Sequence, residues 1–275
     1  MKKISFADIS IALVNRIFNW RFRIAEMTKQ SEIYKKIIDK ILFEDDEIVV
    51  IPNTININKK IESEGSEFLP TQVIKDVIKR SDDIVVMESC LCRTSNQCED
   101  YPQDIGCIFL GPTSRKIPEN IGHKATVEEA LEQVDRADAA GLSHIIGRNK
   151  IDSVWMNIRP GKGLLTICHC CPCCCLWKVY PNLDDDISDK LEKLEGVNVK
   201  LHEDNCRLCK KCLDACMFKA ISFKDKKITI DADNCKGCGL CINTCKFDAI
   251  TIEYTEKTID NIVNRIEGLI EIEEL

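Results

Sequence analysis

Eight cysteines near the C-terminal end restrict the fold of this 275-residue chain more than any other feature. They form two copies of the spacing C-x2-C-x2-C-x3-C, and each cysteine of the second copy lies 29 residues after its counterpart in the first. Three thiolates at this spacing wrap one cube of four irons and four sulfides, and the fourth reaches a second cube. The repeat therefore predicts two 4Fe-4S clusters. Its members are Cys206, Cys209, Cys212 and Cys216, followed by Cys235, Cys238, Cys241 and Cys245.

The spacing also predicts which cysteines share a cluster. Because the fourth cysteine of each copy points away from its own loop, the two sets interleave. One cluster takes Cys206, Cys209, Cys212 and Cys245, and the other takes Cys235, Cys238, Cys241 and Cys216. Eight structural zinc thiolates are the alternative, but zinc sites use pairs of cysteines separated by longer spacers. The pattern favours iron–sulfur clusters over zinc.

Residues 198–254 resemble the bacterial two-cluster 4Fe-4S ferredoxin domain. The flanking residues repeat as well, since Phe218-Lys219-Ala220-Ile221 matches Phe247-Asp248-Ala249-Ile250. The resemblance implies a one-electron carrier, and for this segment we expect two β-hairpins covered by two short helices. Met217 and Lys246 stand where such domains often carry proline after the fourth cysteine. That departure leaves the local turn and the reduction potential open, but not the ligands.

Composition excludes several other classes of protein. A hydrophobic content of 44% supports a folded core, and a net charge of −7 argues against a nucleic-acid binder. The 18 cysteines are clustered too closely to cross-link distant segments, and the N-terminus lacks a secretory signal pattern. No run approaches the roughly 18 apolar residues of a membrane span. We therefore expect a cytoplasmic protein with reduced, metal-bound thiols.

The pattern of apolar residues predicts an α+β fold. We expect a basic helical segment at residues 5–43, which either covers its own core or docks on a partner or an anionic membrane. Further helices are predicted at residues 71–79, 126–141, 188–194 and 255–270, and strands at 47–51, 84–87, 151–158 and 164–168. The predicted units are a helical segment at 1–44, a mixed α/β cysteine-rich domain at 45–185, the ferredoxin domain at 198–254 and a C-terminal helix at 255–275.

Ten further cysteines occupy two short segments of the predicted α/β domain. Six thiols within eight residues are a constant oxidation hazard unless they bind something, so we expect a metal or a cluster there. A redox-active thiol array without metal is the alternative. Ten thiols can hold two cubanes with two thiols to spare, or one larger or non-cubane cluster. The candidate ligands are Cys90, Cys92, Cys98, Cys107, Cys168, Cys170, Cys171, Cys173, Cys174 and Cys175.

These two segments resemble those of a family of anaerobic ferredoxin proteins. Members of that family join a C-x-C-R…C…C region and a C-x-C-C-x-C-C-C run to a C-terminal two-cluster ferredoxin. The resemblance spans about residues 45–254, leaves the first 44 residues unmatched, and implies an iron–sulfur protein without specifying its reaction.

Two residues beside these cysteines have alternative interpretations. Arg93 either offsets the negative charge of cluster thiolates or is an ordinary surface arginine. His169 either ligates a cluster or serves as a neighbouring hydrogen-bonding group. The sequence R-P-G-K-G at 159–163 lacks the spacing of a phosphate loop and is predicted to be a turn.

The sequence thus predicts an iron–sulfur electron-transfer protein with two 4Fe-4S clusters and at least one more cluster in the N-terminal half. Its expected partner is a redox protein or a larger oxidoreductase of an anaerobic metabolism. One alternative is a reductase whose N-terminal cluster acts on a thiol, disulfide or small organic substrate. Another is a cluster-assembly or metal-carrier protein.

Overall fold

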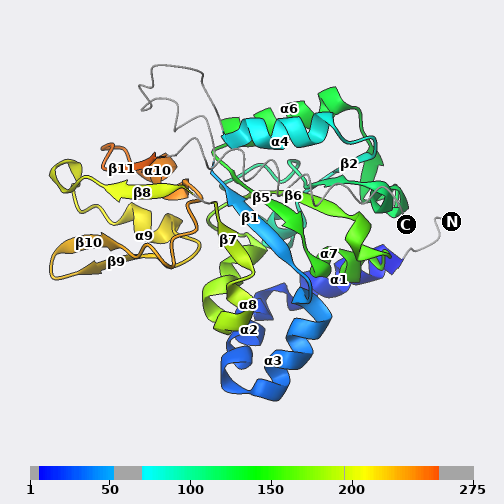
Figure 1. Cartoon of the computed structure of the whole chain (residues 1–275), viewed down its shortest axis with the longest axis horizontal. Helices are drawn as coiled ribbons and strands as arrows, with labels where there is room; N and C mark the ends of the chain where they lie inside the picture. Colours follow the sequence, from blue (N-terminus) through cyan, green and yellow to red (C-terminus); the bar gives the residue numbers. More distant parts are fainter. Residues whose placement is uncertain (1–5, 53–69, 195, 254–275) are drawn as a thin grey trace.

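The computed structural model describes residues 6–52, 70–194 and 196–253. Within these residues, a mixed sheet of seven strands forms the centre of the N-terminal part (Figure 1), in the order β4-β2-β3-β6-β5-β1-β7. Neighbouring strands are antiparallel except β1 and β7, which run parallel. The strands are β1 Glu47–Ile51, β2 Ile84–Met87, β3 Ile108–Leu110, β4 Gly122–Lys124, β5 Ser143–Arg148, β6 Leu165–Cys170 and β7 Leu191–Lys193.

Helices cover both faces of this sheet because its central strands bury alternate residues on opposite sides. Val49 and Ile51 of β1 pack in one core cluster with α4 and α6, whereas Ile48 and Val50 pack on the other face. Figure 1 shows α4 and α6 together above the sheet and α1, α2, α7 and α8 below it. The helices are α1 Phe6–Ile17, α2 Arg21–Gln30, α3 Glu32–Ile38, α4 Pro70–Lys79, α5 Leu91–Ser95, α6 Val127–Ala139, α7 Lys150–Met156 and α8 Asp185–Ser188.

Short irregular helices join these elements. A short π-helix at Asp39–Phe43 leads into β1, and a 3₁₀ segment at Leu176–Asn182 follows the dense cysteine run. The remaining 3₁₀ turns are Phe18–Trp20, Pro112–Lys116, Gly161–Gly163 and Glu203–Asn205. The turn at Gly161–Gly163 lies within the sequence R-P-G-K-G at 159–163, which was predicted to be a turn.

Most predicted elements are confirmed, and two are wrong. The helix at 126–141 forms α6, where the Thr126 side chain accepts a hydrogen bond from the Glu129 N–H. The predicted strand at 151–158 is instead α7, because the Asn149 side chain caps its start and Asn157 ends it in the left-handed conformation. The predicted helix at 188–194 is also wrong, since α8 ends at Ser188 and β7 pairs with β1. The predicted helix at 255–270 lies outside the described residues.

The C-terminal part carries two small two-stranded sheets. The first is the hairpin of β9 Ile221–Lys224 and β10 Lys227–Ile230, which turns at Asp225 and Lys226, both with positive φ. The second pairs β8 Asn198–Leu201 with β11 Ile250–Glu253, the first and last strands of this part. The expected pair of hairpins is therefore corrected to one hairpin and one pair of terminal strands. The helices α9 Lys211–Ala215 and α10 Leu240–Thr244 pack against each other.

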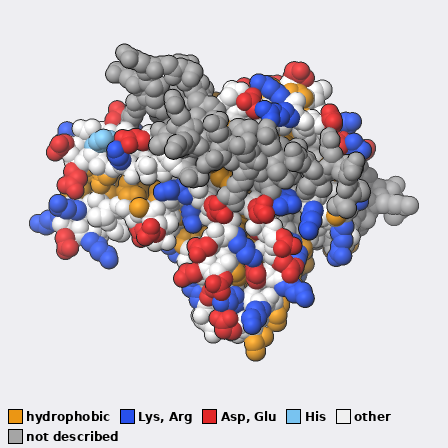
Figure 2. Space-filling model, in the orientation of Figure 1, with side chains coloured by type: hydrophobic (Ala, Val, Ile, Leu, Met, Phe, Trp, Pro, Cys, Tyr) orange, Lys and Arg blue, Asp and Glu red, His pale blue; other side chains and the backbone are white. Residues whose placement is uncertain are grey.

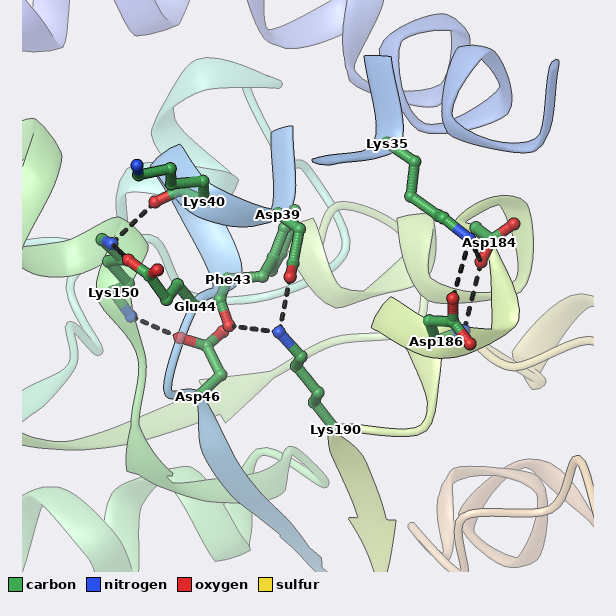
Figure 3. Close-up of polar contacts among 10 residues, drawn as sticks. All are labelled: Lys35, Asp39, Lys40, Phe43, Glu44, Asp46, Lys150, Asp184, Asp186 and Lys190. Carbon is green, nitrogen blue, oxygen red and sulfur yellow. Dashed lines mark hydrogen bonds and ion pairs between the residues drawn. The ribbon is translucent and has the colours of Figure 1, made fainter. Parts of the chain in front are cut away.

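The N-terminal helical segment lies against its own domain. Phe18, Ala25 and Phe43 are buried. Figure 3 shows Lys35 paired with Asp184 and Asp186 of the segment at α8. In contrast, Ile33, Ile37 and Ile41 form an exposed apolar row along α3 and the turn that follows it, and the row of Ile9, Leu13, Ile17 and Trp20 is exposed too. The segment thus covers its own core on one side and leaves apolar residues exposed on the other.

A buried carboxyl stands where this segment meets α7 (Figure 3). Asp46 accepts the backbone N–H of Lys150 through Oδ1 at 2.6 Å, while its Oδ2 is buried without a hydrogen-bond partner. Burial raises the pKa of Asp46 to about 7. Because an uncompensated carboxylate is costly in a buried position, Asp46 binds its proton more tightly in the folded chain than in the unfolded one.

Replacing Asp46 with asparagine is expected to stabilise the fold in a pH-dependent way. The folded pKa of about 7 lies above the ordinary value of 3.8, so the native carboxyl loses stability as pH rises between these values. Asp46→Asn retains an acceptor for Lys150 and removes the charge. Its advantage should grow from about pH 4 to pH 7 and then level off, at about 4 kcal/mol. Anaerobic urea unfolding at pH 5 and pH 8 measures it, with exposed Asp45→Asn as control. An advantage independent of pH would contradict the assignment.

Candidate metal centres

The two cysteine loops of the C-terminal part share a special backbone conformation. Leu208 and Lys210 have positive φ, and so do Gly237 and Gly239, which lie 29 residues later at the matching positions. Positive φ is uncommon for residues with a side chain, and it is held here in both copies. The loop geometry itself therefore repeats, as the sequence does.

These loops direct backbone N–H groups at cysteine sulfurs. The Cys235 sulfur accepts a hydrogen bond from the Gly237 N–H, and the Cys238 sulfur accepts one from Leu240. The Ala220 N–H donates to the Cys216 sulfur at 3.3 Å. Donors of this kind stabilise negative charge on sulfur and tune the potential of iron–sulfur clusters.

The eight cysteines line two separate cavities in this part of the chain. One cavity is lined by Cys206, Cys209, Cys212 and Cys245, and the other by Cys216, Cys235, Cys238 and Cys241. In each cavity, three cysteines come from one copy of the repeat and the fourth from the other copy. Four thiols around a small cavity are the donor set that a cubane cluster requires, so the residues fit that cofactor.

The two cavities differ in exposure, and we name them accordingly. The outer cavity includes exposed Cys209, and its other three cysteines are half-buried. The inner cavity includes buried Cys238 and Cys241. Burial raises the pKa of Cys238 to about 12, so this thiol stays protonated unless a metal replaces the proton.

The inner cavity lies against the N-terminal part. A Cβ built on Gly237 would approach Val197 Cγ1 at 2.7 Å, so only glycine fits this contact. The Asn243 side chain, beside Cys241, donates to the Gly141 carbonyl at 3.0 Å. Cys238 and Leu240 also belong to the same cluster of buried side chains as Cys170 and Cys175. The side chains around the inner cavity therefore pack together with those of the cysteine-rich region.

Strand pairing brings the two N-terminal cysteine segments together. β3 pairs with β6 so that Ile108 lies opposite Ile167, which places Cys107 next to Cys168. Their Sγ atoms are 3.6 Å apart. Cys90 stands at the start of α5, directly after the neighbouring strand β2. The ten cysteines thus gather at one end of β2, β3 and β6.

Four of the ten form a compact group that we call the four-thiol site. The sulfurs of Cys98, Cys171, Cys173 and Cys174 all lie within 4.8 Å of one another. Cys173 Sγ is 3.5 Å from Cys98 Sγ and 3.4 Å from Cys171 Sγ. Four converging thiolates match either a 4Fe-4S cluster or a tetrahedral metal ion.

The other six cysteines form a second group, the six-thiol site. The thiols of Cys90 and Cys92 are hydrogen-bonded, and so are those of Cys170 and Cys175. Cys107 and Cys168 complete the group, since Cys90 is close enough to influence the ionisation of Cys107, and Cys92 that of Cys168. β6 separates the two sites, since Cys168 and Cys170 point to one face of the strand and Cys171 follows its end.

Electrostatics within both sites favour a bound cation. A hydrogen bond from Cys173 lowers the pKa of Cys171 to about 5, and a hydrogen bond with Cys92 lowers that of Cys90 to about 6. The same contacts raise the pKa of Cys173 and of Cys92. One thiol of each pair therefore ionises at the expense of the other. A metal allows all of them to ionise, because its charge replaces that of the protons.

Arg93 is not a surface residue. It is fully buried and donates to the carbonyls of Pro102 at 2.7 Å, His169 at 2.8 Å and Ile105. Its charge also acts on Cys90 and Cys171, one from each site. Arg93 therefore ties the two cysteine segments together and offsets the negative charge of both sites.

His169 has a different environment from its cysteine neighbours. Its Nδ1 is 2.9 Å from His144 Nδ1, and His144 Nε2 is 2.9 Å from Asp138 Oδ1. Because alternate residues of a strand face opposite ways, the ring lies across β6 from Cys168 and Cys170. Its buried Nε2 has no partner among the described residues, and burial lowers the pKa of His169. The structure favours a hydrogen-bonded neighbour over a ligand of the six-thiol site.

Sequence reasoning missed Arg21 and Asp152, both of which line a cavity beside the six-thiol site. Arg21 lies more than 60 residues from the first cysteine, and Asp152 was assigned to a strand. No local pattern connects either residue to the cysteines, because only the packing of α2 and α7 beside the sheet brings them there.

Comparison with known proteins identifies the C-terminal part. The 4Fe-4S dicluster domain family matches residues 205–249. Searches of curated proteins and of solved structures found no significant match. The chain thus contains a 4Fe-4S ferredoxin-like domain, and iron–sulfur and metal binding are supported. Among the described residues, no helix has the length and apolar character needed to cross a membrane.

Arg93→Lys is expected to destabilise the N-terminal part by about 2 to 4 kcal/mol. A lysine cannot reach three carbonyls at once, so buried acceptors lose their donors. Iron bound to the N-terminal half should fall as well, while the signal of the ferredoxin clusters is retained. Urea unfolding and iron quantitation in anaerobic protein check this, with Arg136→Lys as control, because Arg136 makes a surface ion pair with Asp104. Equal stability of the two variants would rule out the role assigned to Arg93.

Proposed function

We propose that this protein is an iron–sulfur electron-transfer protein that relays low-potential electrons through two 4Fe-4S clusters to at least one further cluster in its N-terminal half. The observation that carries the proposal is the division of eight cysteines between two cavities, each with three cysteines from one copy of the repeat and one from the other. Bound clusters supply one-electron redox chemistry, and the chain supplies thiolates, N–H donors and shielding from water.

The ligands in this proposal are the interleaved sets. The outer cluster is held by Cys206, Cys209, Cys212 and Cys245, and the inner cluster by Cys216, Cys235, Cys238 and Cys241. The Gly237 and Leu240 N–H groups donate to sulfurs of the inner set, whereas exposed Cys209 leaves the outer set closer to water. The two clusters therefore differ in environment, which separates their potentials.

Electrons enter at the outer cluster and leave towards the N-terminal half. The outer cavity has the exposed cysteine and is lined by exposed Arg207, Lys210 and Lys211. The inner cavity shares a buried cluster with Cys170 and Cys175. Exposure at one end and burial at the other place the docking site for a redox partner at the outer end.

The proposal also covers the domain boundaries and the cellular role of the chain. We place the cysteine-rich domain at about 45–185 and the ferredoxin domain at about 198–254, with the chain acting in an anaerobic cytoplasm as partner or subunit of a larger oxidoreductase. A reductase with a catalytic N-terminal cluster is a second candidate, and it is favoured by one observation: a large apolar cavity beside the six-thiol site.

Double substitutions distinguish interleaved from sequential ligation. Cys216→Ser combined with Cys238→Ser is expected to cost about four irons, no more than either change alone, because both residues serve the inner cluster. Cys216→Ser combined with Cys212→Ser is expected to cost about eight, although these two cysteines belong to one copy of the repeat. Iron and sulfide quantitation with electron paramagnetic resonance (EPR) of anaerobic protein measures both. The reverse pattern would establish sequential ligation, and a wild type without iron would end the proposal.

The docking end is tested by charge reversal. Figure 2 shows Lys and Arg side chains at the end of the molecule that carries the β9–β10 hairpin. Lys211→Glu is expected to slow reduction by an acidic one-electron carrier about threefold or more at low salt, because steering by opposite charges is lost. Lys226→Glu, at the hairpin turn and outside both cavities, is the matched control. Stopped-flow reduction measures the rates, and equal slowing by both variants would exclude a specific docking end at the outer cavity.

A further inference from the structure

The six-thiol site opens onto a cavity of about 430 Å³, which we call the chamber. Four of its cysteines, Cys90, Cys92, Cys107 and Cys168, line the chamber on one side. A volume of this size is typical of sites for small molecules. The four-thiol site has a different environment, since none of its cysteines lines the chamber.

The rest of the chamber wall is strongly apolar. Val14, Phe18, Phe109 and Trp155 contribute to it, and exposed Leu13, Ile17 and Val154 place its mouth between α1 and α7. A water-filled cavity with such walls is unfavourable, so the wall selects an apolar occupant. On the opposite side, a metal held by the cysteine sulfurs would favour an occupant with a soft donor atom, because thiolate-bound metals prefer such donors.

Two charged residues line the chamber among the described residues, and they play different parts. Asp152 already accepts hydrogen bonds from Trp155 Nε1 at 3.0 Å and Thr166 Oγ1 at 2.7 Å. Arg21 donates through Nη1 to the Phe18 carbonyl at 2.8 Å, but its buried Nε has no hydrogen-bond partner. The positive charge of Arg21 interacts with Cys92 and Cys175. It can therefore balance one more negative charge at the six-thiol site.

We propose that the six remaining cysteines form a second N-terminal metal centre, separate from the four-thiol site, and that the chamber admits a small apolar thiol to it. The thiol binds as a thiolate: its S–H bond breaks, the proton leaves to solvent, and a metal–sulfur bond forms without electron transfer. The alkyl chain occupies the apolar wall. The inference rests on the proposed binding of metal by the N-terminal cysteines.

The division into two metal centres is tested first. Cys98→Ser should lose the iron of the four-thiol site only, and Cys107→Ser that of the six-thiol site only. The double variant should retain only the iron of the two ferredoxin clusters. Cys92→Ser serves as a second probe of the six-thiol site if Cys107→Ser changes the far-ultraviolet circular dichroism. Full N-terminal iron in both six-thiol variants would overturn the second centre, even with the ferredoxin clusters intact.

The chamber is tested on the full-length, iron-loaded protein with 1-hexanethiol as probe and 1-hexanol as its matched control. The thiol should change the EPR and visible absorption spectra in a saturable way, and the alcohol should not. The change should persist in Cys98→Ser and vanish in Cys107→Ser. Val14→Trp fills the chamber and should weaken the apparent affinity about tenfold or more. Ala12→Trp, on the same helix but outside the chamber lining, should leave it unchanged.

The outcomes separate the inference from the proposed function. No thiol response in a protein whose six-thiol iron is present would overturn the chamber inference and leave the electron relay standing. An equal response to hexanol, or one that survives Cys107→Ser, would overturn it as well. Absence of iron from the ferredoxin cysteines would instead overturn the proposed function.

Discussion

The crowding of buried thiols at the end of β6 is the constraint on which the rest of the N-terminal half depends. Neighbouring thiols oppose each other's ionisation, as the lowered pKa of Cys171 and the raised pKa of Cys173 show. Arg93 supplies a fixed positive charge within reach of both sites and holds their two segments in register through three carbonyls. One guanidinium cannot neutralise ten thiolates, so most of these thiols would ionise only where a bound cation replaces their protons, as in the proposed metal centres.

The ferredoxin repeat is symmetric in sequence but lies in an asymmetric environment. Leu208 and Gly237 hold the same left-handed conformation at matching positions, yet only Gly237 lies against Val197. A leucine side chain therefore fits at position 208, whereas a side chain at position 237 would collide with Val197. The contact that requires glycine thus marks the loop that faces the rest of the protein, and it turns two equivalent loops into an outer and an inner one.

The features that the sequence predicted correctly depend on residues that lie close together in the chain. Cysteine spacing predicts the two interleaved groups of four cysteines that line the outer and inner cavities, because one short loop provides three of each group. The Thr126 capping box likewise predicts the start of α6. The strand expected at 151–158 was wrong because Ile151, Val154 and Trp155 also fit helical spacing, and the Asn149 cap decides between the two. The division of the ten N-terminal cysteines could not be predicted, since it depends on β3 pairing with β6 across about 60 residues of chain.

Strand geometry explains why the two N-terminal sites belong to different clusters of buried side chains. Cys168 and Cys170 point to the face of β6 covered by Trp177 and Tyr180, where Cys238 and Leu240 complete the same buried cluster. Cys171 turns to the opposite side and packs with Cys98 near Ala137 and Leu142 at the end of α6. In the proposed relay, electrons from the inner cluster therefore reach the six-thiol site through packed side chains.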